Sequence, residues 1–198
     1  MMGKEDVSQS RVVSYGKNQP IILNSGQTNR LYEIISGGAK LYGYSPSGED
    51  VLIDVAVAGD FIESHDYSVS GYEEFAITLV ETQLKVHFLL EQSLENQLQN
   101  PVISRYIKYL SKRTAHLRRR LINTCSSNAN TRLSYTRKFY DLEIRDSSKN
   151  PYRLIDLLSQ KELGQLGGVT RQTVKKYNNQ LLNISSSLYL LTFPGFIL

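Results

Sequence analysis

Six polar side chains in the stretch "VTRQTVKKYNNQL" are of the types that bind nucleic acids through hydrogen bonds. Arg171 presents a fork of donors that matches guanine, Gln172 can pair with adenine through two hydrogen bonds, and Lys176 can reach a guanine edge or a phosphate. Hydroxyl groups near the start of a helix suit phosphate oxygens, as do its free N–H groups. We therefore predict a helix that reads the major groove of double-stranded DNA. The predicted contacts are Thr170, Arg171, Gln172, Thr173, Lys175 and Lys176.

Two helices joined by a glycine pair would position these side chains. Ser159, followed three residues later by Glu162, forms a capping-box pattern that predicts the start of the first helix. Gly167 and Gly168 allow a tight turn at its end, and Gly164 is expected where the second helix crosses closely. We expect the second helix at residues 170–182, capped by Thr170. The expected buried residues are Leu163, Leu166, Val174, Tyr177 and Leu181. The alternative is a helix hairpin with a solvated polar face.

Charge divides the chain into two unlike halves. Residues 1–100 contain 6 Lys and Arg against 14 Asp and Glu, a net charge of −8, whereas residues 101–198 contain 17 against 5, a net charge of +12. A basic surface favours a polyanion, because each cation laid on a phosphate releases condensed counterions. The second half is therefore predicted to carry the nucleic-acid contacts. No apolar run suits a signal peptide or a membrane span, so we expect a cytoplasmic protein without a membrane partner.

A long helix is predicted between these halves, at residues 101–126. Asn100 can cap it, and Pro101 suits its first turn. Apolar residues and threonines recur in alternating steps of four and three, which is a heptad pattern that favours pairing with a second copy. Packing within its own domain is the alternative. The predicted dimer interface consists of Ile103, Ile107, Leu110, Thr114, Leu117 and Leu121.

The remaining segments suggest a β-rich first half and a helical second half. Short β-like runs separated by glycine-containing turns occupy residues 19–86, which is typical of a sandwich or barrel. Residues 131–144 are expected to form an amphipathic helix with Leu133, Phe139 and Leu142 on its apolar side, and residues 145–153 a loop. The single cysteine, Cys125, excludes an internal disulfide and is expected to be a small packed side chain.

This order of elements resembles the superfamily of the cyclic AMP receptor protein and the fumarate-nitrate reduction regulator (CRP/FNR). The segments that carry the resemblance are "LYEIISGGAKLYGYSPSGEDVLIDVAVAGDFIES" and "LSQKELGQLGGVTRQTVKKYNNQL". The resemblance implies an α+β fold, in which residues 1–100 form a cyclic-nucleotide-binding-like β-barrel (a double-stranded β-helix) that senses an effector. Residues 101–126 would be the dimerisation helix, and residues 127–198 a winged helix-turn-helix DNA-binding domain. It further implies a homodimeric transcription regulator that binds a two-fold symmetric operator and acts with RNA polymerase.

The sequence departs from the family pattern for cyclic nucleotides. The Gly-Glu and Arg-Ser pairs of that pattern are replaced here by Glu63-Ser64 and Glu74-Phe75. Two carboxylates beside a phosphate would be repulsive by about 1 kcal/mol or more each. We therefore expect an effector pocket near Glu63, Ser64, Glu74 and Phe75 that takes an unknown small molecule other than cyclic AMP. Control by a protein partner, or no effector at all, is the alternative.

No cofactor is expected. One cysteine cannot hold an iron-sulfur cluster, and each histidine is expected to be packed or on the surface, although His65 is the best placed for a haem ligand. A barrel enzyme would need more ligands than His65 and His87 supply, so we expect no enzyme. An architectural protein that no longer reads bases is a further alternative. The segment from Asn183 offers only serines, Ser185 to Ser187, for the phosphate contacts of a wing.

Overall fold

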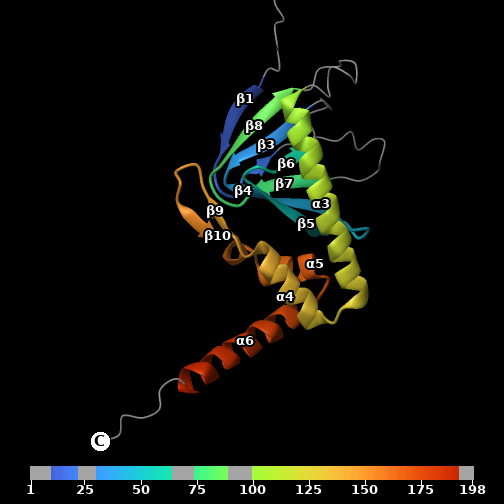
Figure 1. The fold of residues 1–198 in the computed structure, drawn as a ribbon, viewed down its shortest axis with the longest axis vertical. Helices are drawn as coiled ribbons and strands as arrows, with labels where there is room; N and C mark the ends of the chain where they lie inside the picture. The colour runs from blue at the N-terminus through green and yellow to red at the C-terminus, as the bar shows by residue number, and fades with distance from the viewer. Residues whose placement is uncertain (1–9, 22–29, 64–73, 89–99, 192–198) are drawn as a thin grey trace, which may run out of the picture.

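The computed structural model describes residues 10–21, 30–63, 74–88 and 100–191, with side chains described as far as residue 181. Two four-stranded antiparallel sheets form the N-terminal barrel (Figure 1). One sheet has the order β1 (Ser10–Tyr15), β8 (Thr82–Phe88), β3 (Arg30–Ser36) and β6 (Phe61–Glu63). The other has the order β2 (Pro20–Ile21), β7 (Glu74–Thr78), β4 (Gly38–Tyr44) and β5 (Asp50–Val57). The predicted β-like runs thus form strands, and β1 is an addition that the sequence patterns did not reveal.

The barrel core lies between the sheets. It forms because alternate residues of each strand point to one side, so that the apolar members meet in the interior. Buried residues of this core include Ile34, Leu41, Ala56, Leu84 and Val86. Asp54, in β5, is a buried exception to this apolar pattern, because it is only 3% exposed and is surrounded by hydrogen-bond donors that are described below.

The long helix α3 (Pro101–Ser126) has the bounds that the sequence predicts. Asn100 caps it, because its side-chain Oδ1 accepts a hydrogen bond of 2.9 Å from the N–H of Val102. Its first turns pack on the barrel, where Val102, Tyr106 and Tyr109 contact a cluster that contains Leu31 and Phe61. The helix then continues past the barrel and leads to the C-terminal elements (Figure 1).

The C-terminal elements form a head, which we define as α4 through α6. It contains α4 (Ala129–Tyr140), β9 (Glu143–Arg145), β10 (Pro151–Arg153), a 3-10 turn η1 (Leu154–Leu157), α5 (Gln160–Gly167) and α6 (Arg171–Leu191). The apolar core of the head also includes barrel residues, so that Leu52, Val55 and Val80 belong to the same buried cluster as Leu133 and Leu166.

Several local predictions were wrong. The helix expected at residues 131–144 ends at Tyr140, its buried residues are Leu133, Thr136 and Tyr140, and Phe139 is exposed. The β9–β10 hairpin takes the place of the end of that expected helix and of the expected loop at residues 145–153. Asp146 stabilises its turn by accepting hydrogen bonds from the backbone N–H and the side-chain amide of Asn150, at 2.8 and 2.9 Å.

Two further corrections concern single residues and helix length. Cys125, in α3, is exposed rather than packed. The last helix continues to Leu191 instead of ending near residue 182, since no glycine or proline interrupts the sequence before Pro194. The segment that was expected to start a wing, Ser185 to Ser187 included, is therefore helical, while residues 192–198 lie outside the described residues.

Within the described residues, no helix is long and apolar enough to cross a membrane. Over the same ranges, no group of three or more His, Cys, Asp or Glu side chains is arranged to hold a metal ion.

Candidate nucleic-acid interface

The first helix of the helix-turn-helix, α5, begins at the predicted capping box. The hydroxyl of Ser159 accepts a hydrogen bond of 3.2 Å from the N–H of Glu162, and Oε2 of Glu162 accepts one of 2.7 Å from the N–H of Ser159. These reciprocal bonds satisfy two backbone donors that a helix start leaves without partners. Leu163 and Leu166 are buried, as predicted, so one side of α5 is fixed against the core of the head.

The turn between the two helices depends on glycines at two positions. Gly168 follows α5 in the left-handed conformation, with φ of 63°, which glycine adopts without steric cost. Gly164 lies against the turn itself, since a Cβ atom at this position would be 2.7 Å from the carbonyl oxygen of Val169. The predicted close crossing at Gly164 is therefore present.

The second helix, α6, presents most of the predicted DNA contacts to solvent. Arg171, Gln172, Lys175 and Lys176 are exposed, whereas Val174 on the opposite side is 1% exposed. Tyr177 is half-buried, and Leu181 is exposed, so the predicted buried stripe is shorter than expected. The exposed row starts at the first residue of the helix, where free backbone N–H groups also attract anions.

The two threonines at the start of α6 have a structural role. Thr170 caps the helix, because its hydroxyl accepts a hydrogen bond of 3.2 Å from the N–H of Thr173. The two hydroxyl groups also lie 2.9 Å apart. Each hydroxyl retains lone pairs, and Thr170 is exposed. That these two residues contact a DNA phosphate stays a prediction.

Arginines that the sequence patterns did not single out hold the helix-turn-helix in place. Arg132 of α4 donates hydrogen bonds of 3.2 Å to the carbonyl oxygens of Thr124 and Gly168, and one of 3.0 Å to that of Ser127. It thereby joins the end of α3 to the turn before α6. Arg137 donates a hydrogen bond of 3.2 Å to Oδ1 of Asn178, which ties α4 to α6.

Two different stripes run along α3. The stripe that faces the chain's own barrel and head contains Val102, Tyr106, Tyr109, Arg113, His116 and Arg120, all of them buried or half-buried. The predicted dimer residues form the other stripe. Ile107 is 45% exposed, Leu117 38% and Leu121 64%, while Ile103 and Leu110 are half-buried and Thr114 is exposed. A row of large apolar side chains thus lies at the surface of this helix.

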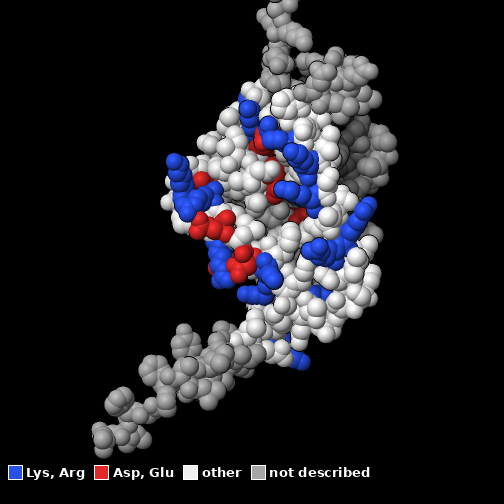
Figure 2. Space-filling view, viewed as in Figure 1, with Lys and Arg blue, Asp and Glu red and all other residues white. Residues whose placement is uncertain are grey.

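The exposed surface of α3 is strongly basic. The helix sequence contains no Asp or Glu, and Figure 2 shows Lys and Arg side chains along the part of the surface that α3 occupies. Arg105 and Arg113 are paired with the barrel residues Glu33 and Asp54, at 2.9 and 3.3 Å. The cations of α3 are Arg105, Lys108, Lys112, Arg113, Arg118, Arg119 and Arg120.

Three of the four residues predicted to line an effector pocket lie in described strands of the barrel. Glu63 ends β6 in one sheet, Glu74 and Phe75 begin β7 in the other, and Ser64 lies outside the described residues. Phe75 stacks on Tyr42, with ring centroids 5.2 Å apart. Burial and a hydrogen bond to Glu63 raise the pKa of Tyr106, which places Glu63 at the helix α3.

The histidines have packing roles where they are described. Nε2 of His87 lies 2.8 Å from Oε2 of Glu33, and the ring is almost completely buried. His116 stacks on Phe139 with ring centroids 3.6 Å apart, and burial lowers the pKa of His116. His65, the best placed of the three for a haem ligand, lies outside the described residues.

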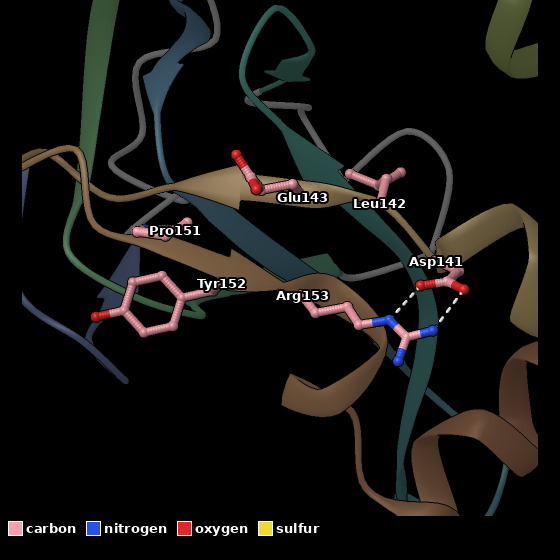
Figure 3. Close-up of a pocket in the computed structure, with 6 residues that line it drawn as sticks. All are labelled: Asp141, Leu142, Glu143, Pro151, Tyr152 and Arg153. Atoms are coloured by element: carbon pink, nitrogen blue, oxygen red, sulfur yellow. Dashed lines mark hydrogen bonds and ion pairs between the residues drawn. The ribbon is translucent and has the colours of Figure 1, made fainter.

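A shallow surface groove of about 340 Å³ lies at the β9–β10 hairpin (Figure 3). Its polar side chains already have partners. Arg153 donates to both carboxylate oxygens of Asp141, Glu143 lies 2.6 Å from Arg145, and the hydroxyl of Tyr152 donates to Asp146. Figure 3 shows the side chains of Arg153 and Asp141 pointing toward each other, and we assign no ligand to the groove. It is lined by Asp141, Leu142, Glu143, Pro151, Tyr152 and Arg153.

Known structures share this arrangement along most of the chain. A transcriptional regulator of the CRP/FNR family from Thermus thermophilus, TTHA1359, superposes with a TM-score of 0.61 at 17% identity, over 87% of this chain and 86% of that one. The chain has the CRP/FNR fold. FixK2 from Bradyrhizobium japonicum superposes with a TM-score of 0.64 at 14% identity, over 89% and 86% of the two chains. TTHB099, a CRP-family regulator also from Thermus thermophilus, superposes with a TM-score of 0.64 at 16% identity, over 87% of this chain and 85% of that one.

No family model and no curated protein sequence matches the chain. The predicted fold class is confirmed, with the CRP/FNR barrel preceding the long helix and the helix-turn-helix. The identities are low, so it is the CRP/FNR architecture that the chain shares with these proteins.

Proposed function

We propose that this chain is a sequence-specific DNA-binding transcription regulator that acts as a homodimer and reads the major groove with α6. The observation that carries the proposal is the exposed row Arg171, Gln172, Lys175 and Lys176 on a helix whose start is capped and whose opposite side is buried. A rigid helix with guanine-type and adenine-type readers at its N-terminal end meets the geometric needs of base recognition.

The homodimer is proposed through the exposed apolar stripe of α3. Leu117 and Leu121 have large exposed fractions, and burial of a leucine in a partner helix stabilises association by about 1.5 to 3 kcal/mol. A second copy suits this stripe because its steps of four and three repeat along the helix, as in paired helices. Two copies would present two α6 helices to a two-fold symmetric operator, and we propose RNA polymerase as the partner through which the bound dimer acts.

Control is proposed through the barrel, by an effector other than cyclic AMP. The carboxylates of Glu63 and Glu74 would repel a cyclic phosphate, and both belong to strands of the barrel, with Glu63 directly at α3. A neutral or cationic small molecule suits these groups better. The pocket itself stays a prediction, as does the identity of its ligand.

Selection from a random DNA pool by the purified, ligand-free protein tests the proposal. We expect enrichment of a two-fold symmetric site with half-sites about one helical turn apart. Binding of the enriched site should weaken steeply with salt, in proportion to the phosphates contacted. Binding that depends on salt but shows no sequence preference would favour the architectural alternative, and a metabolite screen on the barrel would then show whether a missing effector is the cause.

A further inference from the structure

One carboxylate of the helix-turn-helix holds both its own helix and the barrel. Oε2 of Glu162 closes the capping box of α5, while Oε1 accepts hydrogen bonds from Nζ of Lys40 at 2.7 Å and from the hydroxyl of Tyr42 at 2.5 Å. Lys40 and Tyr42 are two residues apart in β4, so their side chains lie on the same face of the strand. The side chains of Lys40 and Glu162 are only 17% and 12% exposed. This ion pair is therefore shielded from most of the solvent.

A second residue of the same helix binds the edge of the same sheet. Gln165 lies three residues after Glu162, which places both on one face of α5. Its Oε1 accepts a hydrogen bond of 3.0 Å from the N–H of Leu52, and its Nε2 donates one of 3.1 Å to the carbonyl oxygen of Asp50. Since β5 is the edge strand of its sheet among the described residues, Gln165 pairs with backbone groups for which they provide no neighbouring strand.

An apolar contact supports these polar ones. Leu52 and Val55 of β5 belong to the same buried cluster as Leu163 and Leu166 of α5. The first helix of the helix-turn-helix is therefore packed on the barrel as well as hydrogen-bonded to it. In Figure 1, α5 lies directly below the end of the barrel sheet that contains β5.

We propose that β4 and β5 set the orientation of the DNA-reading helix through a barrel–head latch, formed by Lys40, Tyr42, Glu162 and Gln165. Gly164 of α5 packs closely against the turn that leads into α6, so the position of α5 determines that of α6. A head held by the latch therefore presents α6 at one fixed position relative to the barrel and to α3. In a dimer that position sets the distance between the two reading helices. Lys40 and Tyr42 are thus positioning residues for DNA recognition, although neither is among the predicted DNA contacts. This inference rests on the proposed function.

The test compares binding to operators whose half-sites are moved apart or together by one and two base pairs. The variants are Glu162→Gln, which keeps one oxygen for the capping box but loses the charge, and the pair Lys40→Met with Tyr42→Phe. The matched control is Lys17→Met, which removes an exposed lysine in the turn between β1 and β2 of the barrel. Wild type and the control are expected to bind one spacing best and to lose affinity steeply at the others.

We expect the latch variants to bind the best operator about fivefold more weakly, because a shielded ion pair no longer fixes the head. They should lose much less than wild type at the altered spacings, so that the spacing profile becomes flatter. A merely structural loss would lower affinity at every spacing by the same factor. A latch-variant profile parallel to that of wild type would therefore overturn the proposal, as would a wild-type profile without any preferred spacing.

A readout without DNA separates this proposal from the proposed function. Amide hydrogen exchange of the DNA-free protein should be faster at the N–H of Leu52 and in the first turn of α5 in the latch variants, and unchanged in Lys17→Met. Unchanged exchange in the latch variants would refute the latch even if the protein binds DNA. Faster exchange in a protein that selects no DNA sequence would support the latch and reject the proposed function.

Discussion

The hydroxyl of Tyr140 in α4 donates a hydrogen bond of 2.7 Å to Oδ1 of Asp54 in β5. The same oxygen accepts from the N–H of Val55 at 2.7 Å, and Arg113 of α3 lies 3.3 Å from Oδ2. One buried carboxylate therefore joins the barrel, the long helix and the head. Such a group is stable only while its partners remain, because an unpaired buried charge is costly.

Replacing Tyr140 by Phe removes one of these donors without leaving a large cavity. We expect Tyr140→Phe to lower the free energy of unfolding by about 1 to 3 kcal/mol, since Asp54 loses a hydrogen bond in a buried site. Urea unfolding followed by circular dichroism measures the change. Tyr135→Phe is the control, because within the described residues that hydroxyl makes a long contact, of 3.4 Å, to Nδ1 of His116. Equal effects of the two substitutions would contradict the role of Asp54.

Gly164 tests the close crossing of the two helices. In Gly164→Ala the added Cβ atom would meet the carbonyl oxygen of Val169 at 2.7 Å, so the turn must move. We expect a loss of about 1 to 3 kcal/mol in the free energy of unfolding. Gly16→Ala is the matched control, because its Cβ would lie 3.4 Å from the flexible side chain of Gln19. A melting temperature of Gly164→Ala equal to that of wild type would show that the turn has room.

Arg171→Ala is expected to weaken binding to the selected operator by about 1 to 3 kcal/mol and to relax the preference at one base pair. The reason is the loss of a forked donor at the start of α6. Lys112→Ala or Arg119→Ala, on the flank of α3, should change selectivity little. Competition binding against operators with single base changes measures both effects, and unchanged selectivity in Arg171→Ala would refute its assignment to a base.

The apolar stripe of α3 predicts the effect of one added charge. Leu121→Lys is expected to raise the dissociation constant of the homodimer at least about tenfold, because each copy loses the burial of a leucine and gains a cation in the interface. Ala115→Lys adds the same charge at an exposed position outside the predicted interface. Sedimentation equilibrium compares the two. A dimer equally stable in both variants would place the interface elsewhere.

The carboxylate of Glu162 predicts a dependence on pH. Burial opposes its ionisation, but hydrogen bonds from Lys40, Tyr42 and the N–H of Ser159 outweigh burial and hold the pKa of Glu162 below its ordinary value of 4.5. A lowered pKa stabilises the folded state above pH 4.5, and this contribution disappears as the pH falls through the lowered value. The stability difference between wild type and Glu162→Gln should thus be constant near neutrality and shrink below pH 4.5. A difference that grew on acidification would contradict this.

Local patterns were sufficient for the predicted helix starts and for the turn. The bonds of Asn100, Ser159 and Thr170 involve partners within three residues, so their chemistry is visible in a short stretch of sequence. The steps of four and three in α3 likewise separate its two stripes. The end of α4 was missed because the helical spacing of apolar residues continues past Tyr140. The β9–β10 hairpin was missed because its turn depends on the hydrogen bonds that Asn150 donates to Asp146.

Long-range partners could not be predicted from the sequence. Lys40 and Glu162 are 122 residues apart, and Asp54 and Tyr140 are 86 apart, so nothing near either residue indicates its partner. In the sequence, the capping box accounts for one carboxylate oxygen of Glu162, and nothing nearby indicates a partner for the other. The exposure of Cys125 was also missed, because a helix position alone does not show which side faces the barrel.

The absence of acidic residues from α3 has a consequence for ionic strength. Two such helices side by side bring two rows of like charges together, and salt weakens their repulsion, since the Debye length falls from about 10 Å at 0.1 M to about 3 Å at 1 M. Salt has the opposite effect on DNA binding, which loses affinity as counterions are added. Low salt should therefore favour monomers that bind DNA without selectivity. High salt should favour dimers that no longer bind DNA. Selective occupancy of an operator should be highest at an intermediate salt concentration, where both equilibria are satisfied.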